Sequence, residues 1–158
     1  MIVSLRDKPD IEMIVLYAQH KNFQVGITSG CFDLTHFYHL YYLERCRRMC
    51  DYLIVGIDSD KLIKETKGDT RPIFSELHRV NLVASYRCVD AVFVMNTSEE
   101  FEKAVNLFRA DMIFKNQGFI DKKVFGADDS KTIIIPDILE DTSTSAFISK
   151  IQGLIDKQ

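Results

Sequence analysis

Two histidines that lie three residues apart, His36 and His39, are the side chains whose type and spacing best suit chemistry. They follow a strand-like apolar run at residues 23–28, and Gly30 allows a turn between that run and the start of a helix. Side chains at i and i+3 share a helix face, and a helix start presents unpaired N–H groups that favour anions. The spacing therefore predicts a site where both imidazoles face a phosphate group.

The histidine pair has two other interpretations. It could be a partly buried pair without a chemical role, or it could ligate zinc together with Cys31. The five-residue gap between Cys31 and His36 and the missing fourth ligand count against zinc, so no metal-ligating residues are expected. Asp33, within the same segment, is expected to brace the turn, and direct contact with a substrate is the lesser alternative.

The elements that must position these residues alternate along the chain. Apolar runs predict strands at residues 24–28, 52–57, 91–94, 112–114 and 132–135. Helical spacing predicts a helix at residues 10–20 and a second marked by Leu40, Leu43 and Cys46. A third is marked by Leu77, Val80 and Val83 or Ala84, behind a possible cap at Ser75. A capping box of Thr97 and Glu100 starts a fourth, and the last is marked by Phe147, Ile148, Ile151, Leu154 and Ile155. Strands that are apolar almost throughout indicate a parallel sheet covered on both faces. The predicted fold is an α/β, Rossmann-like doubly wound parallel sheet of about five strands with helices on both faces.

Polar and basic residues follow the predicted strands, at the ends where such sheets bind ligands. The second strand leads into Lys61, Lys64, Lys67 and Arg71, the fourth into Lys115, and the fifth into Ser143, Thr144 and Ser145. The lysines could instead form a solvated helix face, and the three hydroxyl residues could simply cap the last helix. Arg45, Arg47 and Arg48 are expected to face solvent.

Length and composition fit one globular domain, residues 1–158. The chain is 46% hydrophobic and 27% charged, which excludes a disordered or fibrous class, and its net charge of −3 argues against a general nucleic-acid-binding role. No run approaches the roughly 20 apolar residues of a membrane span, so a cytoplasmic protein without a membrane partner is expected. The four cysteines are expected to be reduced, with Cys46 and Cys50 in the core. Whether the chain forms a homodimer stays open.

Five motifs, spread in order from about residue 23 to residue 151, resemble a single family. They are Gly30-Cys-Phe-Asp-Leu-x-His-x-x-His39, Leu53-Ile-Val-Gly-Ile-Asp-Ser-Asp60, Lys64-x-x-Lys67-Gly-x-x-Arg71-Pro-Ile, Arg79 with Cys88-Val-Asp90, and Ser143-Thr-Ser145. By these motifs the chain resembles the cytidylyltransferase-like nucleotidyltransferases, and most of all the heptose-1-phosphate adenylyltransferase domain of ADP-heptose synthases. Glycerol-3-phosphate cytidylyltransferase is a more distant relative.

The resemblance implies a nucleotidyltransferase that joins a heptose-1-phosphate-like sugar phosphate to a nucleoside triphosphate, with ATP favoured, and releases pyrophosphate. A phosphate oxygen would attack the α-phosphorus in line, so that the protein mainly positions the reactants and stabilises charge. Mg²⁺ carried by the nucleoside triphosphate is the implied cofactor. The matching catalytic positions are His36, His39, Lys64 and Lys67. The matching nucleotide- and phosphate-binding positions are Cys31, Phe32, Asp33, Arg71, Lys115, Ser143, Thr144 and Ser145.

Two features depart from the family's pattern. Tyr38 stands where the family has a glycine between its histidines, and a ring at that position would occupy space that the nucleotide normally uses. Asn116 and Gln117 replace two glycines of the family's Lys-Gly-Gly-Asp-Tyr segment. Two alternatives therefore stand beside the favoured function: a CTP-dependent glycerol-3-phosphate-type cytidylyltransferase, and a catalytically impaired member that binds a nucleotide or a partner.

Overall fold

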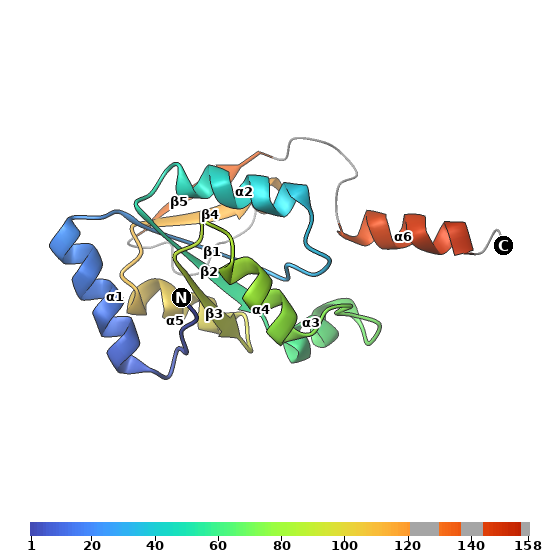
Figure 1. The fold of residues 1–158 in the computed structure, drawn as a ribbon, viewed down its shortest axis with the longest axis horizontal. Coiled ribbons are helices and arrows are strands. Elements are labelled where there is room, and N and C mark those ends of the chain that lie inside the picture. The colour runs from blue at the N-terminus through green and yellow to red at the C-terminus, as the bar shows by residue number, and fades with distance from the viewer. Residues whose placement is uncertain (121–129, 137–143, 156–158) are drawn as a thin grey trace.

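The computed structural model describes residues 1–120, 130–136 and 144–155, and within these ranges one parallel sheet forms the centre of the protein. Its strands are β1 (Val25–Gly30), β2 (Tyr52–Asp58), β3 (Ala91–Met95), β4 (Met112–Asn116) and β5 (Lys131–Ile135), in the spatial order β3-β2-β1-β4-β5 (Figure 1). Each strand begins and ends within two residues of its predicted range. The predicted five-stranded parallel sheet is confirmed.

Helices cover both faces of this sheet, as predicted. They are α1 (Lys8–Lys21), α2 (Phe37–Arg47), α3 (Asp60–Lys67), α4 (Glu76–Ala84), α5 (Glu99–Leu107) and α6 (Thr144–Ile155), with a short 3-10 helix η1 (Gln117–Phe119) after β4. Figure 1 shows α1 and α5 on one side of the strands and α2 on the other.

The helices pack against the two faces of the sheet through two apolar clusters. On β2, Ile54 packs in the cluster with α1 and α5, whereas Leu53 and Val55 pack in the cluster with α2 and α4. Successive residues of a strand point to opposite faces, so a strand buried on both sides must be apolar at almost every position. This requirement explains why the strands read as continuous apolar runs. Cys46 and Cys50 lie in the α2 cluster and are free thiols, as expected.

Two details of the predicted helices are wrong. The capping box was placed at Thr97, but α5 begins at Glu99 with Ser98 as its N-cap. The carboxylate of Glu100 instead accepts a hydrogen bond of 2.6 Å from the amide of Asn96, outside the helix. Leu77 was expected on the apolar face of α4, yet it is 72% exposed. It lies in the first turn of α4, and the face toward the sheet is formed further along the helix.

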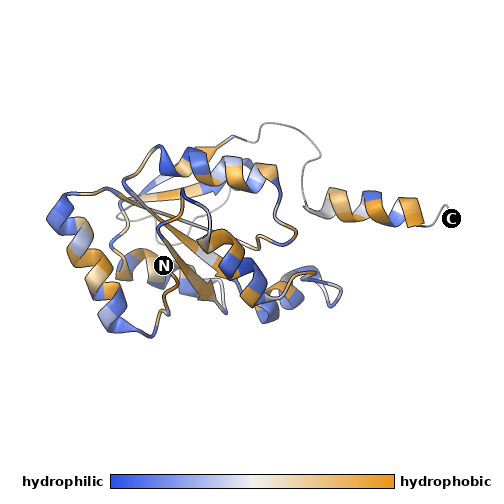
Figure 2. Ribbon diagram, in the orientation of Figure 1, coloured by the Kyte–Doolittle hydropathy of each residue, from blue (hydrophilic) through white to orange (hydrophobic). Residues whose placement is uncertain are grey.

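The last helix, α6, forms at the predicted spacing but leaves its apolar side chains in solvent. Phe147, Ile151, Leu154 and Ile155 are all exposed. Figure 1 shows α6 extending away from the sheet, and Figure 2 shows apolar residues along its length. Among the described residues, no helix is long and apolar enough to cross a membrane.

Candidate active site

The candidate site lies where the direction of strand addition reverses. From β1 the chain adds β2 and β3 on one side, and then returns to place β4 and β5 on the other side of β1. In open parallel sheets such a reversal opens a crevice outside the carboxyl ends of the two central strands. Here those strands are β1 and β4. The segment that carries both histidines, residues 31–39, leaves β1 at this crevice and is called the histidine segment below.

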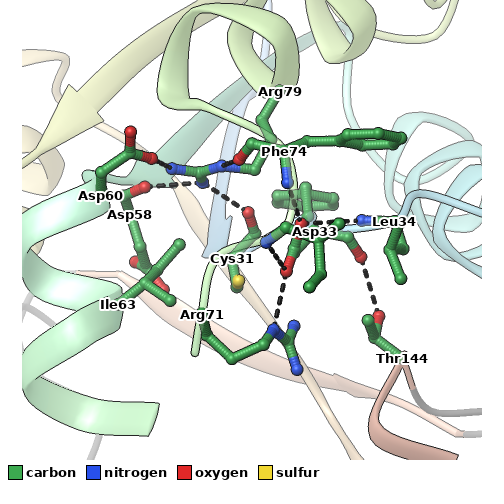
Figure 3. Close-up of polar contacts among 12 residues, drawn as sticks. Cys31, Asp33, Leu34, Asp58, Asp60, Ile63, Arg71, Phe74, Arg79 and Thr144 are labelled. Carbon is green, nitrogen blue, oxygen red and sulfur yellow. Dashed lines mark hydrogen bonds and ion pairs between the residues drawn. The ribbon is translucent and has the colours of Figure 1, made fainter. Parts of the chain in front are cut away.

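Asp33 braces the histidine segment from within. Its carboxylate is fully buried and accepts hydrogen bonds from Nε of Arg71 at 2.7 Å, from the amides of Ile73 and Phe74 at 2.9 Å each, and from the amide of Leu34 at 3.1 Å (Figure 3). Burial by itself would raise the pKa of Asp33, but the bonds from Phe74, Ile73 and Arg71 outweigh burial and lower it. The carboxylate is therefore ionised and engaged by the protein, as the bracing interpretation predicted.

The two histidines contact each other at the start of α2. Their ring centroids lie 4.2 Å apart, and the amide of His36 donates a hydrogen bond of 3.3 Å to Nδ1 of His39. Because Nδ1 of His39 accepts, the neutral ring carries its proton on Nε2. The ring of Phe32 packs beside His39 at 5.6 Å, and the ring of Phe147 from α6 lies 5.0 Å from His36.

Both imidazoles are neutral at pH 7. Burial lowers the pKa of His36. Burial also lowers the pKa of His39 to about 4, helped by repulsion from His36 when that ring is protonated and from Lys67. Neither ring nitrogen of His36 has a hydrogen-bond partner within the described residues, although both atoms are buried. A buried polar atom without a partner is costly. A ligand that supplied an acceptor here would remove that cost.

The lysine helix α3 stands on the β2 side of the histidine segment. Ser59 caps α3 by accepting a hydrogen bond of 3.1 Å from the amide of Leu62. Lys61 faces solvent and pairs with Glu65 at 3.8 Å. For this lysine the alternative of a solvated helix face is confirmed. Lys67 differs, because its charge contributes to the lowered pKa of His39. The charge of Lys67 therefore acts on His39. Lys64 is exposed on the same helix.

The guanidinium of Arg71 is mostly buried, and one of its nitrogens, Nη2, makes no hydrogen bond within the described residues. Its Nε is bound to Asp33, whereas its Nη2 is buried and finds no partner within the described residues. An unpaired guanidinium N–H in a buried position suits an anionic oxygen, because charge-assisted hydrogen bonds are about twice as strong as neutral ones.

The start of α6 meets the histidine segment. The hydroxyl of Thr144 donates a hydrogen bond of 2.9 Å to the backbone carbonyl of Asp33 (Figure 3). This contact places the predicted hydroxyl motif beside the predicted histidine motif, which are 111 residues apart in sequence. Ser143 lies outside the described residues, and so does the side chain of Ser145.

Lys115 points to the α5 face of the sheet. Its ammonium donates a hydrogen bond of 3.0 Å to the hydroxyl of Ser29 and lies 3.8 Å from the ring centroid of Phe101 and 5.1 Å from that of Phe119. Burial lowers the pKa of Lys115 to about 8, and the nearby Asp58 opposes the shift. Lys115 thus lies at the crevice, but protein groups surround its charge.

Cys31 and Phe32 shape the first turn of the histidine segment. Phe32 is buried and has a positive φ of 48°, a conformation that costs a bulky residue energy. The hydroxyl of Thr35 holds that turn by donating a hydrogen bond of 2.7 Å to the carbonyl of Phe32. Burial raises the pKa of Cys31, so its thiol is protonated at neutral pH.

The sequence indicated no role for Arg79, whose side chain makes as many hydrogen bonds near the site as that of Asp33 does. Arg79 is fully buried. Its Nη1 donates to the carbonyls of Cys31 and Asp58 at 2.7 Å each, its Nη2 to the carboxylate of Asp60 at 2.8 Å, and its Nε to the carbonyl of Phe74 at 3.0 Å (Figure 3). The available signal was an arginine directly before Val80, on the side of a helix that should be apolar. Nothing in the sequence indicated the second missed contact, between Phe147 and His36.

The described part of the chain offers no cluster of three or more His, Cys, Asp or Glu side chains arranged to hold a metal ion. The zinc interpretation of Cys31, His36 and His39 thus gains no support from this part of the structure.

A model of the family described as cytidylyltransferase-like matches residues 27–146 of this chain. Among curated proteins, the chain is 37% identical over 141 residues to the bifunctional protein HldE of Campylobacter jejuni and 36% identical over 142 residues to that of Helicobacter pylori. These alignments cover 89% and 90% of this chain but only 30% of each relative. The chain therefore spans less than a third of the length of these relatives.

Solved structures share the fold. The lipopolysaccharide core biosynthesis protein from Thermoplasma volcanium matches with a TM-score of 0.59 and 21% identity over 72% of this chain and 95% of that one. The pantoate-beta-alanine ligase from Francisella tularensis, complexed with beta-gamma ATP and beta-alanine, matches with a TM-score of 0.57 and 13% identity over 89% of this chain and 68% of that one. At these identities the likeness concerns the fold alone.

Proposed function

Because this chain belongs to the cytidylyltransferase-like family, as its motifs predicted, we propose that it is a nucleotidyltransferase. It joins a sugar phosphate of the heptose-1-phosphate type to a nucleoside triphosphate, ATP in preference to CTP, and releases an NDP-sugar and pyrophosphate. The preferences for ATP and for this sugar rest on the resemblance of the motifs.

The observation that carries the proposal is a set of buried hydrogen-bonding groups left without protein partners at the crevice. Both ring nitrogens of His36 and Nη2 of Arg71 are in this state. Native proteins rarely leave such groups unpaired, and functional sites are a common reason when they do. Phosphate oxygens would satisfy these groups, and Lys67, whose charge acts on His39, would supply positive charge.

The resemblance to the family implies the reaction, and this arrangement suits it. An oxygen of the sugar phosphate attacks the α-phosphorus of the triphosphate, the bond from that phosphorus to the oxygen bridging to the β-phosphate breaks, and pyrophosphate leaves with the electron pair. Charge grows on the phosphoryl oxygens in the transition state, and preorganised donors stabilise it there. His39 contributes the Nε2–H of a neutral ring, because its pKa of about 4 leaves it uncharged at pH 7.

Lys64 and Lys67 complete the proposed catalytic set, and the remaining residues bind. Lys64 and Lys67 balance the charge of the phosphates, Arg71 holds a phosphate through its free N–H group, and Ser143, Thr144 and Ser145 bind the β- and γ-phosphates. Cys31, Phe32 and Asp33 shape the turn that presents the histidines to the nucleotide, and Lys115 would contact the nucleotide at the crevice. Mg²⁺ arrives with the triphosphate and would neutralise part of its charge.

Tyr38 supports one competing function, a member that binds nucleotide without catalysis. Its ring centroid lies 5.9 Å from that of His36, so the residue that replaces the family's glycine is next to the catalytic pair. Pyrophosphate release separates the two functions, because a binding protein would take up nucleotide with measurable affinity and release no pyrophosphate with any acceptor.

The test is pyrophosphate release with Mg²⁺ and ATP or CTP, using heptose 1-phosphate and glycerol 3-phosphate as acceptors. Replacing His36 and His39 together by alanine should lower turnover by about 100-fold or more, the usual cost of removing transition-state donors. His20→Ala is the matched control, because His20 is exposed at the end of α1. Near-normal turnover in a folded double variant would refute the assignment. Activity with CTP and glycerol 3-phosphate alone would replace it with the cytidylyltransferase alternative.

A further inference from the structure

Arg79 is a fully buried cation that the proposed reaction does not use. An arginine keeps its charge at any ordinary pH, and a buried charge is tolerated only when its donors meet acceptors. Arg79 meets this condition with four hydrogen bonds of 2.7 to 3.0 Å. The acceptors lie on three stretches of the chain, at Cys31, at Asp58 and Asp60, and at Phe74, so one guanidinium joins parts of the chain that are apart in sequence.

The segments joined by Arg79 are those that carry the candidate site. The carbonyl of Cys31 begins the histidine segment. The carbonyl of Asp58 ends β2, and the carboxylate of Asp60 begins the lysine helix α3. The carbonyl of Phe74 belongs to the loop whose amides bind Asp33. No side chain of these segments spans them in the same way within the described residues.

We propose that Arg79 is a positioning residue that holds the histidine segment and the lysine helix α3 at the separation needed to grip one phosphoryl group between them. The inference deepens the proposed function and rests on it for the identity of the reaction. The contacts themselves do not depend on that function. Arg79 lies under the site and does not contact the reactants.

Only a guanidinium meets this need. Its planar fork directs donors along several fixed directions, whereas the ammonium of lysine is a single point with three donors. In Arg79→Lys the charge remains, but one nitrogen cannot reach Cys31, Asp58 and Asp60 in the directions that the fork uses. In Asp60→Ala the fork remains and only the tie to α3 is lost. The side chain of Asp60 is 40% exposed, so this second variant should fold.

The experiment compares both variants with wild type and with Phe108→Leu, at a temperature where all four proteins are folded. Phe108 is buried in the α5 cluster away from the site, so its replacement matches the loss of stability without touching the linked segments. Pyrophosphate release gives kcat and KM, and calorimetry gives the affinity for Mg-ATP. NMR titration of the imidazoles reports whether Lys67 still lies near His39.

Arg79→Lys should lower kcat at least tenfold, and Asp60→Ala about three- to tenfold, while affinity for Mg-ATP changes less than threefold. The imidazole of His39 should titrate at a higher pH in both variants, because a displaced Lys67 no longer disfavours its protonation. Phe108→Leu should have a lower melting temperature but the kcat and the His39 titration of wild type. Wild-type kcat with an unchanged His39 titration in Asp60→Ala, and in Arg79→Lys where it folds, would overturn the inference. If wild type releases no pyrophosphate, the proposed function fails alone, and the His39 titration still decides the positioning role.

Discussion

Replacing Asp33 by alanine removes the single carboxylate that receives four hydrogen bonds at the base of the site. The side chain of Arg71 is only 9% exposed, so the substitution leaves its charge buried without a counterion. Breaking a buried ion pair from one side costs about 3–5 kcal/mol. The amide of Ile73 also loses its acceptor, but Ile73 is exposed and water can replace the carboxylate.

We therefore expect Asp33→Ala to lower the free energy of unfolding by about 4 kcal/mol at pH 7. For a domain of this size that loss lowers the melting temperature by about 8 to 16 °C. The pKa of Asp33 is lowered in the folded state, so its ionisation stabilises the protein above the ordinary value of 3.8. That contribution is lost as the pH falls below this value, and the difference between wild type and variant should shrink there.

Urea unfolding followed by circular dichroism, at pH 7 and along a series down to pH 3, measures both effects. Asp69→Ala is the control, since Asp69 is exposed in the loop after α3 and its replacement should change stability by less than about 0.5 kcal/mol. A loss below about 1 kcal/mol for Asp33→Ala would refute the reasoning, because it would mean that Arg71 does not need this counterion.

Three further predictions concern the histidine segment and the lysine helix. The pKa of His39 is lowered to about 4 from 6.5, so its contribution to stability is complete above pH 6.5 and should fall as the pH drops from 6.5 toward 4. Urea unfolding of His39→Gln should lack this pH dependence. The same dependence in that variant would contradict the assignment. Lys67→Ala should reduce turnover or triphosphate affinity at least tenfold more than Arg48→Ala, since the charge of Lys67 acts on His39. Equal effects of the two substitutions would indicate general surface electrostatics. Tyr38→Ala and Tyr38→Gly should both tighten nucleotide binding measured by calorimetry, with a lower melting temperature for glycine, which costs roughly 0.5–1 kcal/mol more than alanine in a helix; weaker binding in both would show that the ring stacks on the nucleotide.

Much of the fold was predictable because its signals are local. Residues 52–57 read as a strand from their own apolar run, and the structure extends that strand by one residue, to Asp58. The same holds for the helix after Gly30, whose start carries His36 and His39. Local signals were weaker at helix ends, where Thr97 and Ser98 are equally good caps and backbone conformation chooses between them.

For the candidate site, the sequence indicated which residues suit the chemistry but did not indicate which of them lie together. Residue type and order were enough to select His36, His39, Lys67 and Arg71 as groups that suit phosphate. Lys61, Lys64 and Lys67 share the spacing of one helix, so the sequence does not distinguish their surroundings. In the structure the charge of Lys67 acts on His39, whereas Lys61 pairs with Glu65 in solvent. Only the packing of α3 against β2 decides which part of that helix faces the site.

The partners of Asp33 and Arg79 depend wholly on the tertiary structure. Asp33 meets Arg71 across 38 residues, and Arg79 meets Cys31 across 48. Such contacts form after the sheet has set β1 beside β2 with Gly30 opposite Ile57, and neither strand's sequence specifies that register alone. Periodicity determines which face of an element is apolar. The choice of donor for a buried carboxylate, or of carbonyls for a buried guanidinium, is made by chain segments that approach only when the whole sheet has assembled.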